Sequence, residues 1–464
     1  MERLIKKNIS VLVIADAVAK LLPLLTFPYI TRVMGPEMYG KYGFAMGIVG
    51  FVMLLASPGF TTYGIRMVAQ AKGDEKLLAS KITGIRLAFC GCALLLVAVY
   101  TFALAPSDSA LRTLILIGAL PLLSNALGLE WMLIGASKVL PVALANIAGQ
   151  LVYTVLVLVF LTSPETAWVV PAATFAGVLG ALSIGYVYVR RLFGLAWPTL
   201  SMGDFREIVP PSLLLGFASL MSLLYDKVDV VMMGYFRPMD EVGLYSATYK
   251  LMWMVMSFLP ILSTVFLPLV AKSAAGDAGL GGRESGLYLK FFFLAACPLV
   301  AGGMVVAQPL VEFVLGREYG GSGALFATLL VNVLCGGLAI YYAGLRLVAL
   351  NKNREYLIAV SAGALLNVGL NLIAIPLWGG MGAAVTTCLS QAAVAAVAAW
   401  YARREEGPRL LADAGFPIAA SLLMAVLLQT AMSMVPGLHV LAAVAAGAAI
   451  YGALWALARA GKFA

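Results

Sequence analysis

The chain has 464 residues, of which 62% are hydrophobic and only 11% are charged. Soluble domains carry about 25% charged residues, so this composition excludes an ordinary soluble protein and indicates a chain that lies largely within a membrane. The formal net charge of +9 gives no reason to expect a nucleic-acid partner, because basic loops that face anionic lipid produce the same excess.

Fourteen apolar segments follow one another along the chain, each near the roughly 20 residues that a spanning helix needs. They are residues 8–33, 41–62, 85–105, 111–134, 139–162, 167–189, 208–234, 242–269, 287–309, 323–348, 356–376, 380–402, 413–434 and 438–458. No stretch between them is long enough for a soluble domain. We therefore predict an all-α polytopic membrane protein with fourteen transmembrane helices.

The basic residues indicate the orientation. With the N-terminus in the cytoplasm, 22 of the 31 Lys and Arg residues belong to the inner side, 5 to the outer side, and 4 lie within segments. Cytoplasmic loops carry an excess of Lys and Arg, and one missed helix would invert every later loop. The split predicts that both termini face the cytoplasm.

A short motif recurs six helices apart. Residues 40–42 read Gly-Lys-Tyr soon after a Met-Gly pair, and residues 243–245 read Gly-Leu-Tyr soon after another Met-Gly pair. An even offset gives both copies the same orientation, which is the pattern of a parallel repeat.

Four stretches carry a family signature: residues 28–42 (PYITRVMGPEMYGKY), 63–66 (YGIR), 242–247 (VGLYSA) and 315–319 (LGREY). They resemble the Wzx-type polysaccharide transporters, the oligosaccharide-lipid flippases of the multidrug/oligosaccharidyl-lipid/polysaccharide (MOP) exporter superfamily. The resemblance implies a MATE-like fold with two six-helix lobes around a central cavity, alternating access, and a bacterial cytoplasmic-membrane location. We expect the lobes at residues 1–206 and 207–410, with helices thirteen and fourteen at 411–464.

Charged residues at membrane depth are the first functional candidates. Each costs about 2.5–3.5 kcal/mol to insert, so it usually faces a cavity or a partner. Lys20 lies roughly 18 Å along the first helix, and Asp16 lies one turn before it on the same face. This pair either packs inside the protein or presents a cation to a cavity. Glu130, near the cytoplasmic end of the fourth helix, is interpreted as an interfacial residue.

The seventh and eighth helices hold a second charged group. Asp226 and Asp229 share one face of the seventh helix, and Lys227 is turned about 100° from Asp226. Lys250 in the eighth helix lies at the same expected depth as Asp226. A pair between them would be either a structural bridge or part of a cavity wall.

Further residues are candidates for contact with the substrate. Arg32, near the outer end of the first helix, would meet substrate in an outward-open state. Arg346, near the cytoplasmic end of the tenth helix, either snorkels to headgroups or faces substrate. Tyr245, Tyr249 and Trp253 recur on one face of the eighth helix and either stack on sugars or anchor and pack the helix.

The resemblance implies a flippase that moves an undecaprenyl-diphosphate-linked oligosaccharide, such as an O-antigen repeat unit, to the outer leaflet. Its diphosphate requires cationic groups, and Lys and Arg bind phosphate through charge-assisted hydrogen bonds. The predicted substrate-binding residues are Lys20, Lys250, Arg32, Lys227 and Arg346. No catalytic residue is expected.

Two alternatives stay open. A multidrug or cation antiporter of the same superfamily would have an acidic, aromatic cavity, and the membrane-depth basic residues count against it. A membrane enzyme, such as a glycan polymerase or ligase, would have a long outer loop with catalytic groups, whereas the outer gaps in this chain are short.

No cofactor or metal is expected. Residues 35–41 approach the P-loop pattern, but Tyr42 stands where a Ser or Thr would bind magnesium, and the single histidine cannot form a histidine-rich metal site. Uphill transport would be coupled to protons, sodium or the membrane potential through Asp16, Asp226 and Asp229. The expected partners are the lipid-linked glycan, the bilayer, and a polysaccharide polymerase with its chain-length regulator. The protein itself is expected to be a monomer.

Cysteine labelling of intact cells tests the topology. Single cysteines in the outer gaps should react with a membrane-impermeant reagent, and those in the inner gaps should be protected. The outer positions are Ser107, Pro164 and Gly437, and the inner positions are Ser201 and Gly407. Labelling of Gly407→Cys from outside would overturn the predicted orientation.

Overall fold

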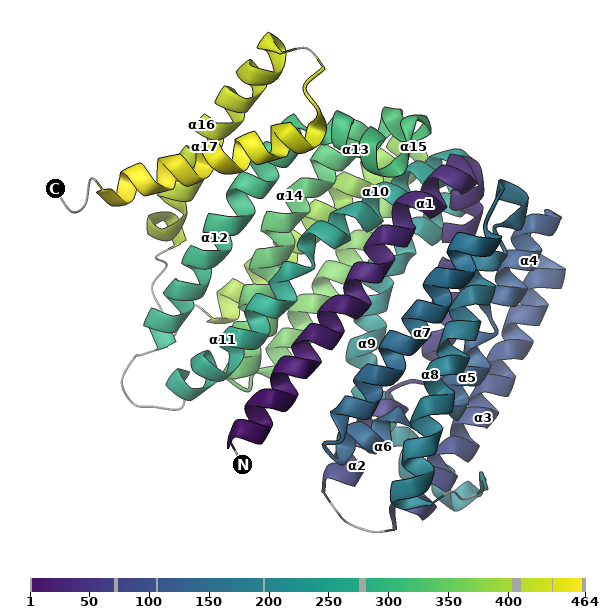
Figure 1. Cartoon of the computed structure of the whole chain (residues 1–464). Coiled ribbons are helices and arrows are strands. Elements are labelled where there is room, and N and C mark those ends of the chain that lie inside the picture. Colours follow the sequence, from purple (N-terminus) through teal and green to yellow (C-terminus); the bar gives the residue numbers. More distant parts are fainter. Residues whose placement is uncertain are drawn as a thin grey trace. The chain divides into compact units, whose positions relative to one another are not determined.

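The computed structural model describes residues 2–70, 74–105, 107–194, 197–274, 281–402, 410–435 and 437–460. Within these residues the secondary structure is helical, without a strand (Figure 1). The chain divides into two compact units, Met1–Gly234 and Tyr235–Ala464, called unit 1 and unit 2 below. The prediction of an all-helical protein is confirmed.

Unit 1 is a bundle whose helix ends carry clear local signals. It contains α1 (Glu2–Ala56), α2 (Phe60–Ala69), α3 (Glu75–Val99), η1 (Tyr100–Leu104), α4 (Ser109–Gly118), α5 (Pro121–Leu127), α6 (Glu130–Gly135), α7 (Val139–Phe160), η2 (Pro164–Thr166), α8 (Val169–Phe193) and most of α9 (Met202–Phe236). The Asp74 carboxylate accepts backbone N–H bonds of 3.0 and 3.2 Å at the start of α3. Such a cap satisfies donors that a first helical turn leaves unpaired.

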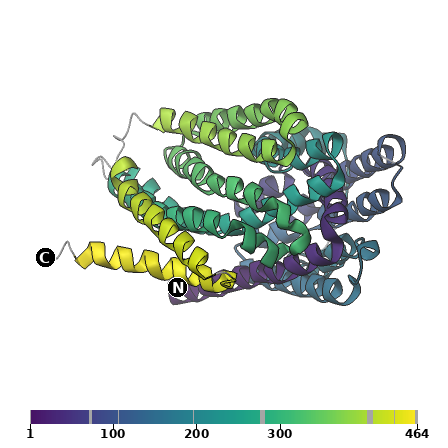
Figure 2. The ribbon, with the colours of Figure 1, turned by 90° about the horizontal axis from the view of Figure 1, so that it is seen from above.

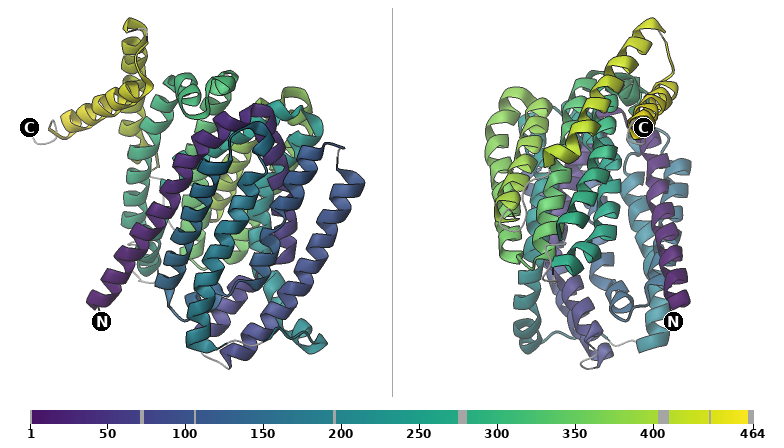
Figure 3. Two further views of the ribbon diagram at one scale, coloured as in Figure 1. Left: turned by 45° about the vertical axis from the view of Figure 1, so that its right-hand side comes forward. Right: turned by 90° about the vertical axis from the view of Figure 1, so that its left-hand side faces the viewer.

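Unit 2 begins with the last two residues of α9 and ends with a helical hairpin. It contains α10 (Met239–Met256), α11 (Phe258–Ala274), α12 (Gly281–Val305), α13 (Ala307–Leu315), η3 (Arg317–Ser322), α14 (Gly323–Ala339), η4 (Ile340–Leu347), α15 (Asn353–Ala402), α16 (Leu410–Met434) and α17 (Val440–Ala460). Helix α14 packs on α15 (Figure 2). Helix α16 packs along α12, and α17 contacts α16, α12 and α13 (Figure 3).

Two long helices reverse direction at a glycine. Gly35 in α1 has φ 65° and Gly379 in α15 has φ 55°, a backbone conformation that favours glycine. In α15 the two arms pack against each other, because Ala359 on one arm and Val394 on the other belong to the same buried cluster. Each glycine therefore joins two antiparallel arms.

The helix lengths establish a polytopic membrane protein. Within the described residues, ten helices are long and apolar enough to cross a membrane, or eleven if Met239–Met256 and Ile261–Val270 form one bent span. α15 counts once in this number although it contains two arms. The coarse fold prediction is confirmed, and the count of fourteen helices stays a prediction.

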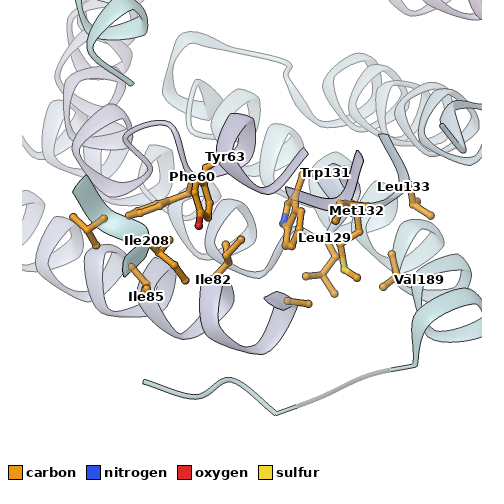
Figure 4. Close-up of a cluster of buried hydrophobic side chains, with 13 residues drawn as sticks. Phe60, Tyr63, Ile82, Ile85, Leu129, Trp131, Met132, Leu133, Val189 and Ile208 are labelled. Carbon is orange, nitrogen blue, oxygen red and sulfur yellow. The ribbon is translucent and has the colours of Figure 1, made fainter. Parts of the chain in front are cut away.

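A buried cluster around Trp131 fixes α2, α3 and α6 in unit 1 (Figure 4). Trp131, Phe60 and Ile82 are fully buried in it. Gly64 of α2 allows the close approach, because a Cβ at this position would lie 2.5 Å from the Trp131 ring. Leu129 and Leu133 hold the short helix α6 against this cluster.

The segment between α8 and α9 is fastened to α3. The Ser80 hydroxyl donates to the Trp197 carbonyl, and the Thr199 N–H donates to the Ser80 carbonyl at 3.2 Å. Lys81 pairs with Asp204 at 2.8 Å. A side chain at Gly84 would overlap the Thr199 carbonyl oxygen, so glycine at this position is what lets the segment lie against α3.

The variant Gly84→Ala should destabilise unit 1. Its methyl group must displace the backbone of residue 199, and overpacking of this kind typically costs about 1–3 kcal/mol. Gly91→Ala on the same helix is the matched control, because nothing lies within 4 Å of a Cβ there. Thermal unfolding of both variants in detergent should show a lower Tm for Gly84→Ala alone. An equal Tm for the two variants would contradict the packing argument.

Candidate functional site

Three predicted residues have side chains outside the part of the chain that the structure describes. Asp16 and Lys20 belong to α1, and Asp226 belongs to α9. The Asp16–Lys20 and Asp226–Lys250 pairs therefore stay predictions. The remaining predicted residues are distributed over both units.

In unit 1, two predicted cations are accessible and one predicted carboxylate is enclosed. Arg32 on α1 and Lys227 on α9 are exposed. Asp229, two residues beyond Lys227, is only 2% exposed. A buried carboxylate is costly unless it is paired or protonated. Asp229 is the one member of the predicted coupling set whose side chain the structure describes, and it is enclosed by protein.

In unit 2, Lys250 lies on an otherwise enclosed helix. From Glu241 to Met256 on α10, Lys250 is the single exposed residue, and the others are buried or half-buried. Its neighbours Tyr249 and Leu251 are 7% and 6% exposed. It lies about 16 Å along the helix from Met239 at 1.5 Å per residue. Between Glu241 and Met256, α10 is therefore accessible at one position, and that position is a lysine.

The aromatic residues of α10 pack against one another. Tyr245 and Tyr249 stack with ring centroids 5.6 Å apart, and Trp253 meets Tyr249 edge-on at 6.4 Å. Tyr245 is fully buried. Of the two sequence interpretations, this arrangement supports helix packing for Tyr245 and leaves its ring no face for a sugar.

Arg346 is enclosed inside unit 2. It lies in the π-helical turn η4, is 4% exposed, and donates from Nη1 to the Ser285 hydroxyl of α12 at 2.8 Å. A snorkelling side chain would be accessible at its tip. The structure therefore does not support snorkelling for Arg346, whose guanidinium is buried and bound to Ser285. π-helical turns often mark functional positions.

Sequence reasoning missed a buried arginine at a break in the fourth span. Residues 128 and 129 are non-helical between α5 and α6, which leaves carbonyl oxygens without helical partners. Arg86 of α3 is fully buried and donates to the Gly128 carbonyl at 2.8 Å and to the Asn125 carbonyl. Its position beside an inner loop in the sequence gave no signal of this role.

A second missed feature is a polar network between the two arms of α15. Asn367, Asn371 and Thr386 are buried; Asn371 donates to Asn367 at 3.2 Å, and Thr386 donates to the Asn371 amide oxygen. Two asparagines four residues apart in an apolar segment were the available signal, since they share a helix face.

Charged residues hold both glycine turns. Lys41 pairs with Glu37 at 3.0 Å and with Asp108 at 2.8 Å beside the Gly35 turn. Burial pushes the pKa of Asp108 upward, but Lys41 and backbone N–H groups outweigh it and hold the pKa below the ordinary carboxyl value. The stabilisation is therefore present at neutral pH and lost as the pH falls through the lowered value.

At the second turn, Glu241 of α10 accepts the Gly380 N–H at 2.9 Å and is paired with Arg237 at 2.7 Å. The glutamate therefore satisfies a backbone donor beside Gly379, where the chain leaves the helical conformation. Glu241 and Arg237 thus have a structural explanation.

Unit 2 also contains an apolar cavity of about 410 Å³. Helices α10, α12, α13, α14, α16 and α17 contribute to its wall. Pro298, Phe326, Met424 and Val444 are among the lining residues, and Tyr451 supplies a hydroxyl. This chemistry suits hydrocarbon and gives no charged group to a polar ligand.

The profile of the family described as polysaccharide biosynthesis protein matches residues 5–274, more than half of the chain. A protein of Escherichia coli (strain K12) named "Putative O-antigen transporter" is 21% identical over 418 residues, covering 87% of this chain and 97% of its own length. A protein of the same name from Shigella dysenteriae is 22% identical over 330 residues, covering 68% and 80%.

Solved structures share the fold. The lipid II flippase MurJ in an inward-closed conformation has a TM-score of 0.77 at 14% identity, over 98% of this chain and 99% of its own. An inward-facing multidrug resistance MATE family transporter of the MOP superfamily has a TM-score of 0.63 at 16% identity, over 87% and 98%. At these identities the likeness establishes the fold alone.

The family match, the transporter names of the relatives and the shared fold agree with one another, and these relatives are named as transporters or flippases, not as enzymes. The resemblance drawn from residues 28–42 and the later motifs is confirmed. The chain belongs to the polysaccharide biosynthesis protein family.

Proposed function

We propose that the chain is a flippase that carries undecaprenyl-diphosphate-linked oligosaccharide from the cytoplasmic to the outer leaflet by alternating access through a cationic cavity. The observation that carries this proposal is Lys250, the single exposed residue of α10 between Glu241 and Met256. A charged side chain at membrane depth usually faces a water-filled cavity or a partner. An ammonium group in that position attracts an anionic substrate group.

The diphosphate is the part of the substrate that the basic residues would hold. Lys20, Arg32 and Lys227 are proposed to line the cavity with Lys250, and Arg32 and Lys227 are accessible as this requires. Arg346 would act differently, because it is bound to Ser285 in this conformation. It would reach the diphosphate only after a rearrangement that releases this bond.

The polyprenyl tail needs an apolar environment. The cavity in unit 2 with Pro298, Phe326 and Met424 in its wall provides one inside the protein, in addition to the surrounding lipid. A substrate with a charged head and a hydrocarbon tail matches this separation of cationic and apolar surfaces.

The proposed architecture has fourteen helices: a lobe at residues 1–206, a lobe at 207–410, and two further helices at 411–464. Both termini would face the cytoplasm from the inner membrane. The proposed assembly is a monomer that delivers its glycan to a polysaccharide polymerase and chain-length regulator.

Replacement of Lys20 or Lys250 by Ala or Glu should abolish export of the glycan without loss of folded protein. Arg should restore part of the activity, because charge matters more here than the shape of the group. Surface polysaccharide would be measured in cells that carry only the variant. Lys138→Ala, an exposed lysine before α7, is the matched control and should export normally. Full export by Lys20→Glu or Lys250→Glu would reject the assignment.

A cation antiporter is the second candidate, because MATE transporters share the fold. Such a protein would bind cations in an acidic cavity, whereas the exposed residue of α10 is a lysine. The specific observation therefore favours an anionic substrate over a cationic drug.

Coupling is proposed to depend on a carboxylate–lysine pair that opens when the diphosphate binds. Asp16, Asp226 or Asp229 would then accept a proton or sodium ion, and one elementary charge moved across the membrane is worth roughly 2.3 kcal/mol per 100 mV. In proteoliposomes, wild-type transport should collapse with the gradient, and Asp16→Asn or Asp226→Asn should be gradient-independent. Unchanged gradient dependence in both single variants and in the double variant would place coupling elsewhere.

A further inference from the structure

The segment between α8 and α9 exposes large apolar side chains. Trp197 is 90% exposed, Leu200 is 59% exposed and Met202 is 69% exposed. The described part of the protein therefore leaves these three side chains largely uncovered. None of them belongs to the substrate or coupling sets proposed above.

The backbone beneath these side chains is fixed to α3. The Ser80 hydroxyl donates to the Trp197 carbonyl, and the Thr199 N–H donates to the Ser80 carbonyl at 3.2 Å. Further along the segment, the Lys81 ammonium pairs with Asp204 at 2.8 Å. These contacts hold the backbone in place, so the exposed side chains belong to a defined surface.

This surface lies where α3 enters its apolar run. A Cβ at Gly84 would overlap the Thr199 carbonyl oxygen, so Thr199 lies against the turn directly before the predicted apolar segment 85–105. α3 itself belongs to the candidate membrane span Glu75–Leu104. Tryptophan is enriched at the boundary between hydrocarbon and water, and Trp197 is at the level expected for that boundary.

Basic side chains from two helices accompany the apolar ones. Arg190 and Arg191 in the last turn of α8 are exposed. Lys76 in the first turn of α3 is also exposed, and a Cβ at Gly194 would lie 3.8 Å from its Cδ. Since the Gly194 N–H donates to the Arg190 carbonyl at 3.1 Å, Lys76 lies beside the end of α8. Within the described residues, none of the three cations has an ion-pair partner.

The acidic residues of this region lie around a different feature. Asp74, Glu75 and Glu207 line a pocket of about 180 Å³ together with Lys81. Asp204 is buried and paired with the same lysine. The three cations at the end of α8 and the start of α3 are not part of this pocket. They therefore combine with the exposed apolar side chains into one basic and apolar surface, called the linker surface below.

We propose that the linker surface binds an anionic phospholipid of the leaflet that it faces, which is the cytoplasmic leaflet in the predicted topology. The three cations would hold the headgroup phosphate through charge-assisted hydrogen bonds. The three apolar side chains would enter the boundary between headgroups and acyl chains, as those of interfacial amphipathic segments do. Basic residues beside a membrane span attract anionic lipid. The bound lipid would anchor the connection between the predicted lobes 1–206 and 207–410 at the membrane surface.

Fluorescence quenching of the full-length protein in lipid nanodiscs tests the proposal. All nanodiscs would contain the same mixture of phosphatidylcholine and phosphatidylglycerol. In one sample the phosphatidylglycerol carries brominated acyl chains, and in the other an equal amount of phosphatidylcholine does. Bromine quenches an indole that it contacts, so the two samples differ only in which lipid is reported.

The chain has seven tryptophans, so the Trp197 signal is obtained by subtracting the signal of the Trp197→Phe variant. In the wild type, brominated phosphatidylglycerol should quench this signal roughly twofold or more strongly than brominated phosphatidylcholine, because each nearby basic residue favours anionic lipid.

The triple variant Lys76→Gln/Arg190→Gln/Arg191→Gln should lose the preference, so that both brominated lipids quench Trp197 equally. A matched control removes the same charge from three exposed positions elsewhere in the chain by substitution with Gln, at Lys138, Lys290 and Arg354. This control should keep the wild-type preference. If the triple variant does not fold, Arg191→Gln alone should reduce the preference.

Equal quenching of Trp197 by the two lipids in the wild type would overturn the proposal, because it indicates membrane contact without selection of a headgroup. Quenching by neither lipid would also overturn it, since the surface would then face water or a protein partner. The same conclusion follows if the triple variant, or Arg191→Gln in its place, keeps the full preference, or if the control loses it. The measurement uses no glycan, so its failure would leave the flippase proposal to its own test.

Discussion

Inside a bilayer, every backbone N–H and carbonyl must find its partner within the protein. This chain departs from regular helix at several points, and charged side chains complete the backbone at two of them. Arg86 donates to the carbonyls at the break before α6, and Glu241 accepts the Gly380 N–H beside the Gly379 turn. These contacts permit breaks and reversals that an apolar sequence alone would not tolerate.

The charged residues of the membrane helices therefore fall into two groups: those that satisfy backbone groups and those that are accessible. Arg86 and Glu241 are explained by the backbone groups they satisfy, and their removal would leave buried polar atoms unpaired, at a typical cost of about 1–3 kcal/mol each. Lys250 differs from them because it is the exposed residue of α10 between Glu241 and Met256. A charged side chain that is accessible on a membrane helix is a candidate for contact with a substrate.

The sequence predicts much of this fold because apolar length is a strong signal. The predicted segments 139–162 and 167–189 correspond to α7 (Val139–Phe160) and α8 (Val169–Phe193), and the motif around Gly35 coincides with a real reversal of the chain. Sequence analysis missed the break at Gly128, because the segment 111–134 is long and apolar enough to be interpreted as one helix despite Asn125 and Glu130 within it. From its position in the sequence, Arg86 is one of the 22 basic residues assigned to the inner side. In the folded protein its guanidinium is completely buried.

The candidate sites were less predictable, since a charge in an apolar segment looks the same whether it faces protein, lipid or water. Exposure on the folded helix makes the distinction. Arg346 and Lys250 both lie in predicted helices of unit 2, yet one is 4% exposed and bound to Ser285, and the other is the accessible residue of α10.

This contrast bears on how a carrier releases an anion that it attracts. A diphosphate held by many fixed cations would bind too tightly to leave, whereas a cation with an alternative partner can exchange it. Arg346 already has one in the Ser285 hydroxyl. A change of conformation that moves η4 relative to α12 would alter the cationic charge offered to the diphosphate without any change in protonation. Alternating access would then modulate affinity through hydrogen-bond exchange, with the accessible Lys250 providing the constant attraction.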